Sequence, residues 1–362
     1  MKKRITALLL LFTLSVTSLL ACTSADKPES ATGKTSKTSK SINDKKTDLT
    51  PVTLNEVAHS IFYAPMYVAM EKNYFEKEGI DLSLVTGFGA DKTMTAVLSG
   101  TADIGFMGSE ASIYTYNEGA RDYVVNFAQL TQRAGNFLVA RENIKNFKWE
   151  DLKGRKVIGG RKGGMPEMVF EYILKQNHID PASDLTIDQN IDFGSTAAAF
   201  SEEKADYDFT VEFEPGATNL EKQGKGYVVA SLGTDSGYVP YTAFSAKKSY
   251  ISQHPEIIQG FTNALQKGMN YVASHTPEEI AQVIAPQFKE TTPDTITTIV
   301  SRYYEQDTWK KDLIFRQESF DLLQDILEDA GELKKRAPYK NLVTTIYAEK
   351  SAKAVKDTTL SH

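Results

Sequence analysis

The chain has 362 residues, more than one compact core usually holds, so two folded domains are expected. Hydrophobic residues make up 41% and charged residues 24%, which excludes a disordered chain, a collagen-like repeat and a polytopic membrane protein. The formal net charge is −6, with the acidic excess in the part after residue 50, so nucleic-acid binding is not expected.

The N-terminus has the pattern of an export signal. Lys2-Lys3-Arg4 precede an apolar run over 5–20 that is short, and too rich in Thr and Ser, for a membrane-spanning helix. The run ends in Leu19-Leu20-Ala21-Cys22, which resembles the bacterial lipobox, where the cysteine is diacylated and becomes the mature N-terminus. A plain signal peptide with an incidental cysteine is the alternative. We expect a lipoprotein signal peptide over 1–21 and lipidation of Cys22.

Cys22 is also the only cysteine, which excludes a disulfide framework and a Cys-based structural zinc site. Residues 23–50 are mostly Ser, Thr and Lys with almost no large apolar side chain, so they cannot form a core. We interpret 22–50 as a lipidated cysteine and a disordered tether. The expected location is the extracytoplasmic face of the cell membrane, held there by the lipid on Cys22.

The part after residue 50 alternates strands and helices in two series. The first series has predicted strands at 52–57, 80–85, 104–107 and 123–130, and predicted helices at 64–77, 90–98 and 109–117. The second has predicted strands at 156–160, 186–189, 207–211 and 227–231, and predicted helices at 166–176, 196–201 and 216–223. After 244 only helices are predicted, at 254–273, 277–284, 293–304 and 319–330. The alternation predicts an α/β protein with parallel-rich sheets and helices on both faces.

Two α/β series predict two lobes joined by two hinge strands, with the chain crossing near 140–145 and returning near 236–245. The expected boundaries are 51–140 plus 245–362 for lobe one and 141–244 for lobe two. In open α/β sheets, ligands bind at the carboxyl ends of the strands, so the strand-to-helix loops should carry the function.

Six segments, in chain order, carry a resemblance to a known family. They are His59-Ser-Ile-Phe-Tyr-Ala-Pro65, the run 69–80, Leu98-Ser-Gly-Thr-Ala-Asp-Ile-Gly105, Asp151-Leu-Lys-Gly-Arg-Lys-Val157, Phe213-Glu-Pro215 and His254-Pro255-Glu256. Together they resemble the ABC-transporter solute-binding proteins for sulfonates, taurine, nitrate and thiamine pyrimidine precursors, over about 52–275. Phe213 departs from that family, which has Trp there.

The resemblance implies a two-lobe, type II-like periplasmic-binding-protein fold that closes on a small solute. It also implies delivery to an ABC permease with its ATPase, and we expect the binding protein to be a monomer. Beyond residue 290 the resemblance implies little.

The loops at the strand ends supply ten candidate ligand-binding residues: Ser60, Tyr63, Phe88, Ser109, Glu110, Glu167, Glu212, Phe213, Glu214 and Tyr238. Four of them are carboxylates, which would oppose an anion strongly in a closed cleft of low dielectric. They suit a solute rich in N–H donors or positive charge. An aminopyrimidine fits, because a carboxylate can accept from its amine while an aromatic ring stacks on it. We therefore expect a solute like a thiamine pyrimidine precursor.

Several candidates have an alternative role in the fold. Glu110 and Glu167 lie in first turns of predicted helices, where a carboxylate stabilises the helix dipole without any ligand. Ser109 and Glu214 are placed to cap the helices that follow them. Tyr238, near the predicted return hinge, either closes over the ligand or stiffens the crossing.

Two other functions stay open at this stage. The first is a receptor for an aliphatic sulfonate, taurine or another small organic acid. The second is an enzyme like the fungal synthase of the thiamine pyrimidine, because the family also resembles that synthase. The absence of cysteine after Cys22 and the export signal argue against the enzyme. The five histidines lack metal-ligand spacing, and no GxGxxG, P-loop or Ser-His-Asp pattern occurs. We expect no enzyme activity, no metal and no cofactor.

Overall fold

A computed structural model describes residues 49–192 and 194–359. These residues belong to one of the two units that the chain forms, Thr47–His362. The predicted signal peptide, Cys22 and all but the end of the predicted tether lie outside the described residues. Among the described helices, none has both the length and the apolar character that crossing a bilayer requires.

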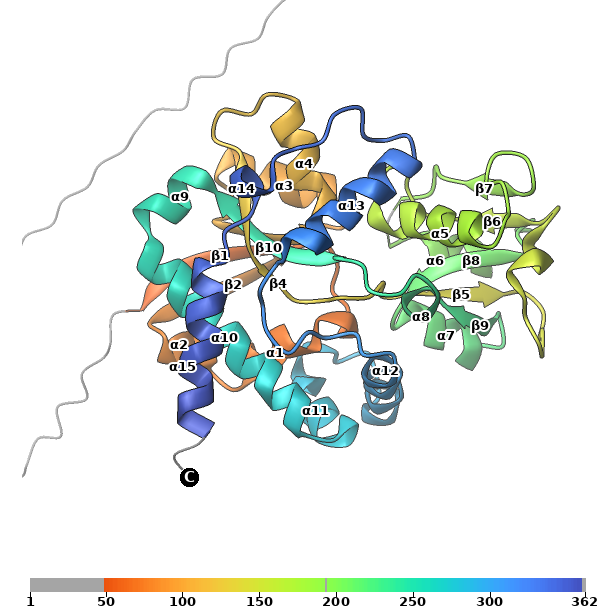
Figure 1. The fold of residues 1–362 in the computed structure, drawn as a ribbon. Helices are drawn as coiled ribbons and strands as arrows, with labels where there is room; N and C mark the ends of the chain where they lie inside the picture. Colours follow the sequence, from red (N-terminus) through yellow and green to blue (C-terminus); the bar gives the residue numbers. More distant parts are fainter. Residues whose placement is uncertain (1–48, 193, 360–362) are drawn as a thin grey trace, which may run out of the picture. The chain divides into compact units, whose positions relative to one another are not determined.

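The first sheet has five strands in the order β2-β1-β3-β10-β4. Figure 1 labels β1, β2, β4 and β10 of this sheet. The strands are β1 (Thr50–Glu56), β2 (Ile80–Thr86), β3 (Ile104–Gly108), β4 (Val124–Gln129) and β10 (Thr242–Lys247). The connecting helices are η1 (Ile61–Tyr63), α1 (Ala64–Glu71), α2 (Tyr74–Lys77), α3 (Ala90–Ser99) and α4 (Glu110–Asn117). β1 runs parallel to β2 and β3, whereas β10 is antiparallel to both of its neighbours.

The second sheet repeats this plan in the order β7-β6-β8-β5-β9. Its strands are β5 (Asn136–Ala140), β6 (Lys156–Ile158), β7 (Thr186–Asp188), β8 (Phe209–Phe213) and β9 (Tyr227–Ser231). Its helices are η2 (Trp149–Leu152), α5 (Met165–Gln176), α6 (Thr196–Ser201), α7 (Gly216–Lys222) and α8 (Leu232–Asp235). β6 is parallel to β7 and β8, and β5 is antiparallel to β8 and β9. The predicted class, parallel-rich sheets covered by helices, is confirmed.

The sequence reasoning missed β5. Its five residues, Asn-Phe-Leu-Val-Ala, are all buried, but the run is too short to show a period. Because β5 belongs to the second sheet, the chain passes between the sheets from Gln129 to Asn136, before the crossing expected near 140–145. The chain returns to the first sheet between α8 and β10.

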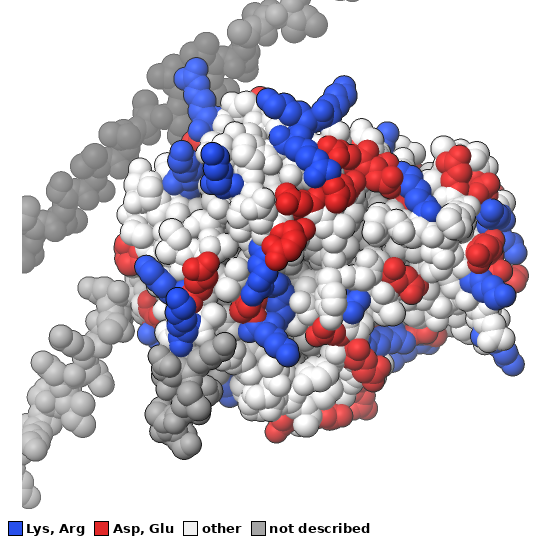
Figure 2. Space-filling view, viewed as in Figure 1, with Lys and Arg blue, Asp and Glu red and all other residues white. Residues whose placement is uncertain are grey.

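After β10, the described chain continues as helices joined by loops. They are α9 (Lys248–Gln253), α10 (Pro255–Ser274), α11 (Pro277–Ile284), η3 (Ala285–Gln287), α12 (Pro293–Glu305), α13 (Gln317–Asp329), α14 (Tyr339–Leu342) and α15 (Ile346–Thr359). Thr276 begins α11 with a capping box, in which its side chain and that of Glu279 each accept from the other's backbone N–H. In the view of Figure 2, acidic and basic side chains are interspersed over the surface of these helices and of the second sheet's elements.

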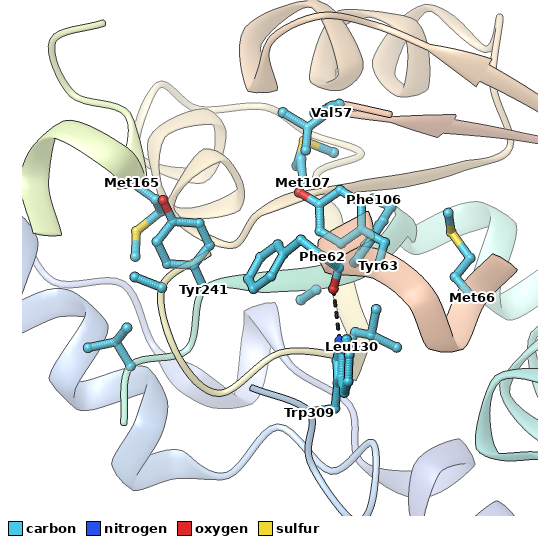
Figure 3. Packing of buried hydrophobic residues seen from close by; sticks show 14 of the residues in the cluster. Val57, Phe62, Tyr63, Met66, Phe106, Met107, Leu130, Met165, Tyr241 and Trp309 are labelled. Atoms are coloured by element: carbon cyan, nitrogen blue, oxygen red, sulfur yellow. Dashed lines mark hydrogen bonds between the residues drawn. The ribbon is translucent and has the colours of Figure 1, made fainter. Parts of the chain in front are cut away.

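Aromatic packing fixes the loop that follows β1. Phe62 and Tyr63 of η1 are fully buried, and Phe62 lies edge-on to Tyr241 with 5.7 Å between ring centroids. The indole N–H of Trp309 donates to the carbonyl of Phe62 at 2.8 Å (Figure 3). A buried carbonyl that had no such partner would cost about 1–3 kcal/mol. Trp309, which follows α12, thus helps to hold η1 where β1 ends.

Candidate functional site

A cavity of about 290 Å³ lies where strand ends of both sheets meet. The first sheet contributes the residues after β1, the turn of Phe88 and Gly89 with the first residue of α3, and Gly108 and Glu110 around the end of β3. The second sheet contributes the turn before α5, the start of α6 and the stretch 211–216. This is the position at which open α/β sheets bind ligands. Seven of the ten candidate residues line it: Ser60, Tyr63, Phe88, Glu110, Glu212, Phe213 and Glu214.

Glu110 is a buried carboxyl with incomplete hydrogen bonding. It is the first residue of α4, and its Oε2 has no hydrogen-bond partner among the described residues. Burial raises the pKa of Glu110 to about 7, although its own backbone N–H, Arg161 and the Met165 N–H all act to lower it. Near neutral pH the carboxyl is therefore divided between its charged and neutral forms, and it can accept or donate a hydrogen bond.

Glu212 is the second such carboxyl, near the end of β8. Its Oε2 accepts from the Thr196 hydroxyl at 2.9 Å, and its Oε1 accepts from the Thr210 hydroxyl at 2.6 Å. Burial raises the pKa of Glu212 to about 7, and the two hydroxyls act to lower it. No cation offsets the Glu212 charge in the described structure, whereas each carboxylate oxygen has room for a further hydrogen bond.

Glu214 lines the same cavity but is fully partnered. Its Oε1 lies 2.8 Å from the guanidinium of Arg302 on α12, and it also accepts from the Thr218 hydroxyl at 2.8 Å. Its Oε2 accepts from the Thr218 backbone N–H at 2.9 Å, so the side chain does cap α7. Arg302 also pairs with Glu221 at 2.7 Å. Glu214 is held by the fold and has little capacity left for a ligand.

The aromatic candidates differ from one another in exposure. Tyr63 is fully buried, and Phe213 is half-buried with its ring 5.8 Å from that of Phe62. Phe88 is 56% exposed at the cavity and has a left-handed backbone, φ +56°, which costs a non-glycine residue about 1 kcal/mol or more. Ser60 lies at the wall as well, but its hydroxyl donates to the carbonyl of Glu214 at 2.6 Å.

Three candidates lie outside the cavity lining. Ser109 does not cap α4; its hydroxyl donates to the carbonyl of Pro240 at 3.1 Å. Glu167 is buried in α5 and accepts from the Gly163 backbone N–H at 3.1 Å and from Gln189 at 2.6 Å. Burial and the neighbouring Glu171 raise the pKa of Glu167 to about 8.

Tyr238 is the third. It is exposed, its hydroxyl donates to Asp307 at 2.6 Å, and the guanidinium of Arg133 lies over its ring. The sequence left two roles open for Tyr238, closing over the ligand or stiffening the segment that returns to the first sheet. These contacts fit the second role.

The structure adds lining residues that sequence reasoning did not select. Thr196 follows a stretch with no motif, and Asn136 begins the strand that was missed. Asn136 accepts a hydrogen bond from Tyr241, which also lines the cavity. Arg161 is the only Arg or Lys among the described lining residues, and it faces Asp91 at 3.6 Å. The glycine-rich sequence around Arg161 was the feature from which this loop could have been predicted to line the cavity.

His59 lines the cavity beside a buried polar cluster. Its Nδ1 lies 2.8 Å from the carboxylate of Glu56, and its Nε2 lies 2.9 Å from the carbonyl of Gln287. Burial lowers the pKa of His59, but the bonds to Glu56 and Gln287 outweigh it and the pKa is raised overall. No group of three or more His, Cys, Asp or Glu side chains in the described part of the chain could hold a metal ion.

Comparisons with known proteins agree with this architecture. The chain is 47% identical over 302 residues to "Putative binding protein YtlA" of Bacillus subtilis (strain 168), covering 83% of this chain and 90% of that protein. It is 25% identical over 262 residues to riboflavin-binding protein RibY of Chloroflexus aurantiacus, covering 71% and 72%. The fold matches that of the alkanesulfonate-binding protein SsuA from Xanthomonas axonopodis pv. citri bound to MOPS. That match has a TM-score of 0.67 and 14% identity, and it covers 82% of this chain and 98% of that one.

The periplasmic-binding-protein fold that the resemblance implied is confirmed by this match. The model of the NMT1/THI5-like family matches residues 61–280, which is more than half of the chain and includes the whole second sheet and every strand of the first except β1. The chain belongs to the NMT1/THI5-like family.

Proposed function

We propose that the protein is the solute-binding component of an ABC importer, and that it captures a small heteroaromatic solute like a thiamine pyrimidine precursor. The observation that carries the solute class is the pair of buried carboxyls, Glu110 and Glu212, that line one cavity and form no salt bridge among the described residues. A carboxyl of that kind accepts from an exocyclic amine and, when protonated, donates to a ring nitrogen. A small anion would meet two carboxyls and gain only Arg161.

The size and lining of the cavity support a single ring. Its volume of about 290 Å³ lies just below the usual range of ligand pockets, roughly 300–1,000 Å³. Phe88 and Phe213 provide ring faces at the lining. The strained, exposed position of Phe88 contributes nothing evident to the core, which favours a role in stacking. The Chloroflexus relative is named for riboflavin, itself a ring system with N–H and carbonyl groups.

The two sheets, each with its own helices, act in this proposal as two lobes. Ligand binding would favour the arrangement in which both contact the solute, as in hinge closure of binding proteins. The protein is proposed to act as a monomer and to pass the solute to its permease without turnover. The names of the relatives above describe binding, which supports this reading over the synthase-like enzyme.

Calorimetric titration of the full chain in mild detergent tests the solute class. Hydroxymethylpyrimidine, the aminopyrimidine of thiamine, should bind one to one, and ethanesulfonate should not bind at pH 8. Glu212→Gln should weaken hydroxymethylpyrimidine about tenfold, since one charge-assisted hydrogen bond is lost. Tighter ethanesulfonate binding by Glu212→Gln, with hydroxymethylpyrimidine unaffected, would instead favour the sulfonate or organic-acid receptor.

The lipid anchor is proposed separately, from Leu19-Leu20-Ala21-Cys22 alone. Two acyl chains on Cys22 would hold the protein on the extracytoplasmic face, since each buried methylene contributes about 0.8 kcal/mol. Growth with labelled palmitate should label the wild type and leave Cys22→Ser unlabelled and released. Equal labelling of both proteins would contradict the anchor.

A further inference from the structure

The position of the Glu110 carboxyl is unusual because it lies at two helix N-termini. Glu110 begins α4, which follows the first sheet's β3, and Met165 begins α5, which follows the second sheet's β6. The backbone N–H groups of both residues act on the Glu110 carboxyl, as does the guanidinium of Arg161. The first N–H groups of a helix lack partners within it and carry partial positive charge, so such ends attract anions.

The neighbouring backbone is shaped to admit this carboxyl. A Cβ built on Gly108 would lie 2.1 Å from Oε2 and 2.5 Å from Oε1 of Glu110. Any larger residue at 108 would therefore displace the carboxyl. Glu110 is 2% exposed, it lines the cavity, and its Oε2 has no partner among the described residues. The helix ends, the glycine and the unpartnered oxygen are three separate observations on one position.

We infer that Glu110 is a specificity-determining residue: its carboxylate occupies an anion-binding position between the N-termini of α4 and α5 and thereby excludes anionic solutes from the cavity. This inference rests on the proposed binding function and deepens it. Without the carboxylate, the two helix ends and Arg161 would present positive charge to this part of the cavity. That position would then suit an anion, and the Glu110 side chain reverses its preference.

Protonation of Glu110 provides a test that needs no mutation. The pKa of about 7 means that the side chain loses its charge as the pH falls through neutrality. The other charged and titratable groups acting on it or lining the same cavity are Arg161, Tyr63, Tyr114, Tyr241, His59, Glu212 and Glu214. The raised pKa values of the three tyrosines keep them neutral between pH 6 and 8. Glu212, with a pKa of about 7, does titrate in this range, and the pKa of His59 is raised by Glu56 and Gln287, so a Glu110 variant must separate their contributions.

The experiment is calorimetric titration of the full chain with ethanesulfonate, which stays anionic throughout, at pH 6, 7 and 8. The wild type should bind at least tenfold more weakly at pH 8 than Glu110→Gln. Wild-type affinity should also rise more steeply than that of Glu110→Gln as the pH falls. Glu167→Gln is the matched control: it neutralises another buried carboxyl in the first turn of α5, but one outside the cavity lining, and it should gain nothing.

Hydroxymethylpyrimidine separates failure of this inference from failure of the proposed function. One outcome would overturn this inference and leave the proposed function standing. In it, the wild type binds hydroxymethylpyrimidine, and Glu110→Gln unfolds at the wild-type temperature but binds ethanesulfonate no more tightly than the wild type does. No wild-type binding of hydroxymethylpyrimidine, with the ethanesulfonate gain present, would overturn the solute class and leave the inference standing. Should Glu110→Gln fail to fold, Glu110→Ser replaces it, and the wild-type pH series provides a second test. A wild-type ethanesulfonate affinity that is equal at pH 6 and pH 8 would overturn the inference.

Discussion

Glu214, from the second sheet, and Glu110, which follows the first sheet's β3, line one cavity. Both are buried, but they differ in how many partners their carboxylate oxygens have. Glu214 has Arg302, the Thr218 hydroxyl and the Thr218 backbone N–H on its two oxygens. Glu110 has an oxygen with no partner and a pKa raised to about 7 by burial. Burying an unpaired carboxyl is costly, so the partners show which carboxyl serves the fold. The missing partner at Glu110 points to a role in selecting the solute.

The largest expected effect is on the pH dependence of stability. The pKa values of Glu110 and Glu212 rise from 4.5 to about 7 on folding, so the folded state binds protons more tightly. Their stabilising contribution is complete below pH 4.5 and is lost as the pH rises through about 7, by up to about 3 kcal/mol for each carboxyl. Urea unfolding of the ligand-free protein should therefore show lower stability at pH 8 than at pH 5.

The double variant Glu110→Gln, Glu212→Gln should flatten that difference, because neither side chain then titrates. Glu142→Gln, at an exposed position, is the matched control and should leave the pH dependence as in the wild type. An unchanged difference in the double variant would show that these two carboxyls are not the source.

The next largest effect should come from removing the cation of Glu214. Arg302→Met leaves a carboxylate with 0% side-chain exposure beside no positive charge, at a cost of about 3 kcal/mol in unfolding free energy. This value takes the lower end of the usual range because Arg302 itself is 27% exposed. Adding Glu214→Gln should restore part of the loss, and urea unfolding of the four proteins in the cycle measures the coupling. Additive losses would mean that the pair contributes nothing.

A smaller effect is expected from the hydroxyl beside Glu212. Thr196→Val removes a donor at 2.9 Å and should cost about 2 kcal/mol at pH 8, where the carboxylate is charged, and less at pH 5. Thr210→Val removes the donor on the other oxygen, but Thr210 does not line the cavity. Both variants should lose stability, and both should change the hydroxymethylpyrimidine affinity by the amount that follows from a disturbed Glu212. Only Thr196→Val should change that affinity further, because Thr196 itself lines the cavity. Equal affinity changes would remove Thr196 from the site.

The smallest effect concerns the exposed ring at the cavity. Phe88→Ala should leave stability within about 0.5 kcal/mol of the wild type, because the side chain is 56% exposed. Its hydroxymethylpyrimidine affinity should fall about fivefold, the loss expected for one aromatic contact. Calorimetry measures the affinity and thermal unfolding the stability. Unchanged affinity would mean that Phe88 does not stack on the solute.

The order of most strands and helices could be predicted because each leaves a local period: β1, β2 and α3 are found within two residues of their expected ends. β5 could not, since five buried residues carry no period and the strand is defined by pairing with β8 and β9, far along the chain. The long helix α15 was passed over as well.

Candidate carboxylates could be named from their loops, but their partners could not. Arg302 lies 88 residues after Glu214, so no local pattern indicated that Glu214 would pair with a cation. In the same way, Glu167 was indistinguishable from Glu110 until the fold turned one toward Gln189 and the other toward the cavity. Pairing across the chain decides which acidic residue is available, and that is a property of the tertiary structure.

Native mass spectrometry of the full chain, purified in mild detergent without refolding, tests the central claim most directly, because it can identify the solute that the protein carries. The account predicts a bound mass that fragments as a neutral or cationic nitrogen heterocycle and is released by Glu212→Gln. A co-purified sulfonate, nitrate or carboxylate in the wild type would contradict the claim that the unpaired carboxyls set the selectivity of the cavity.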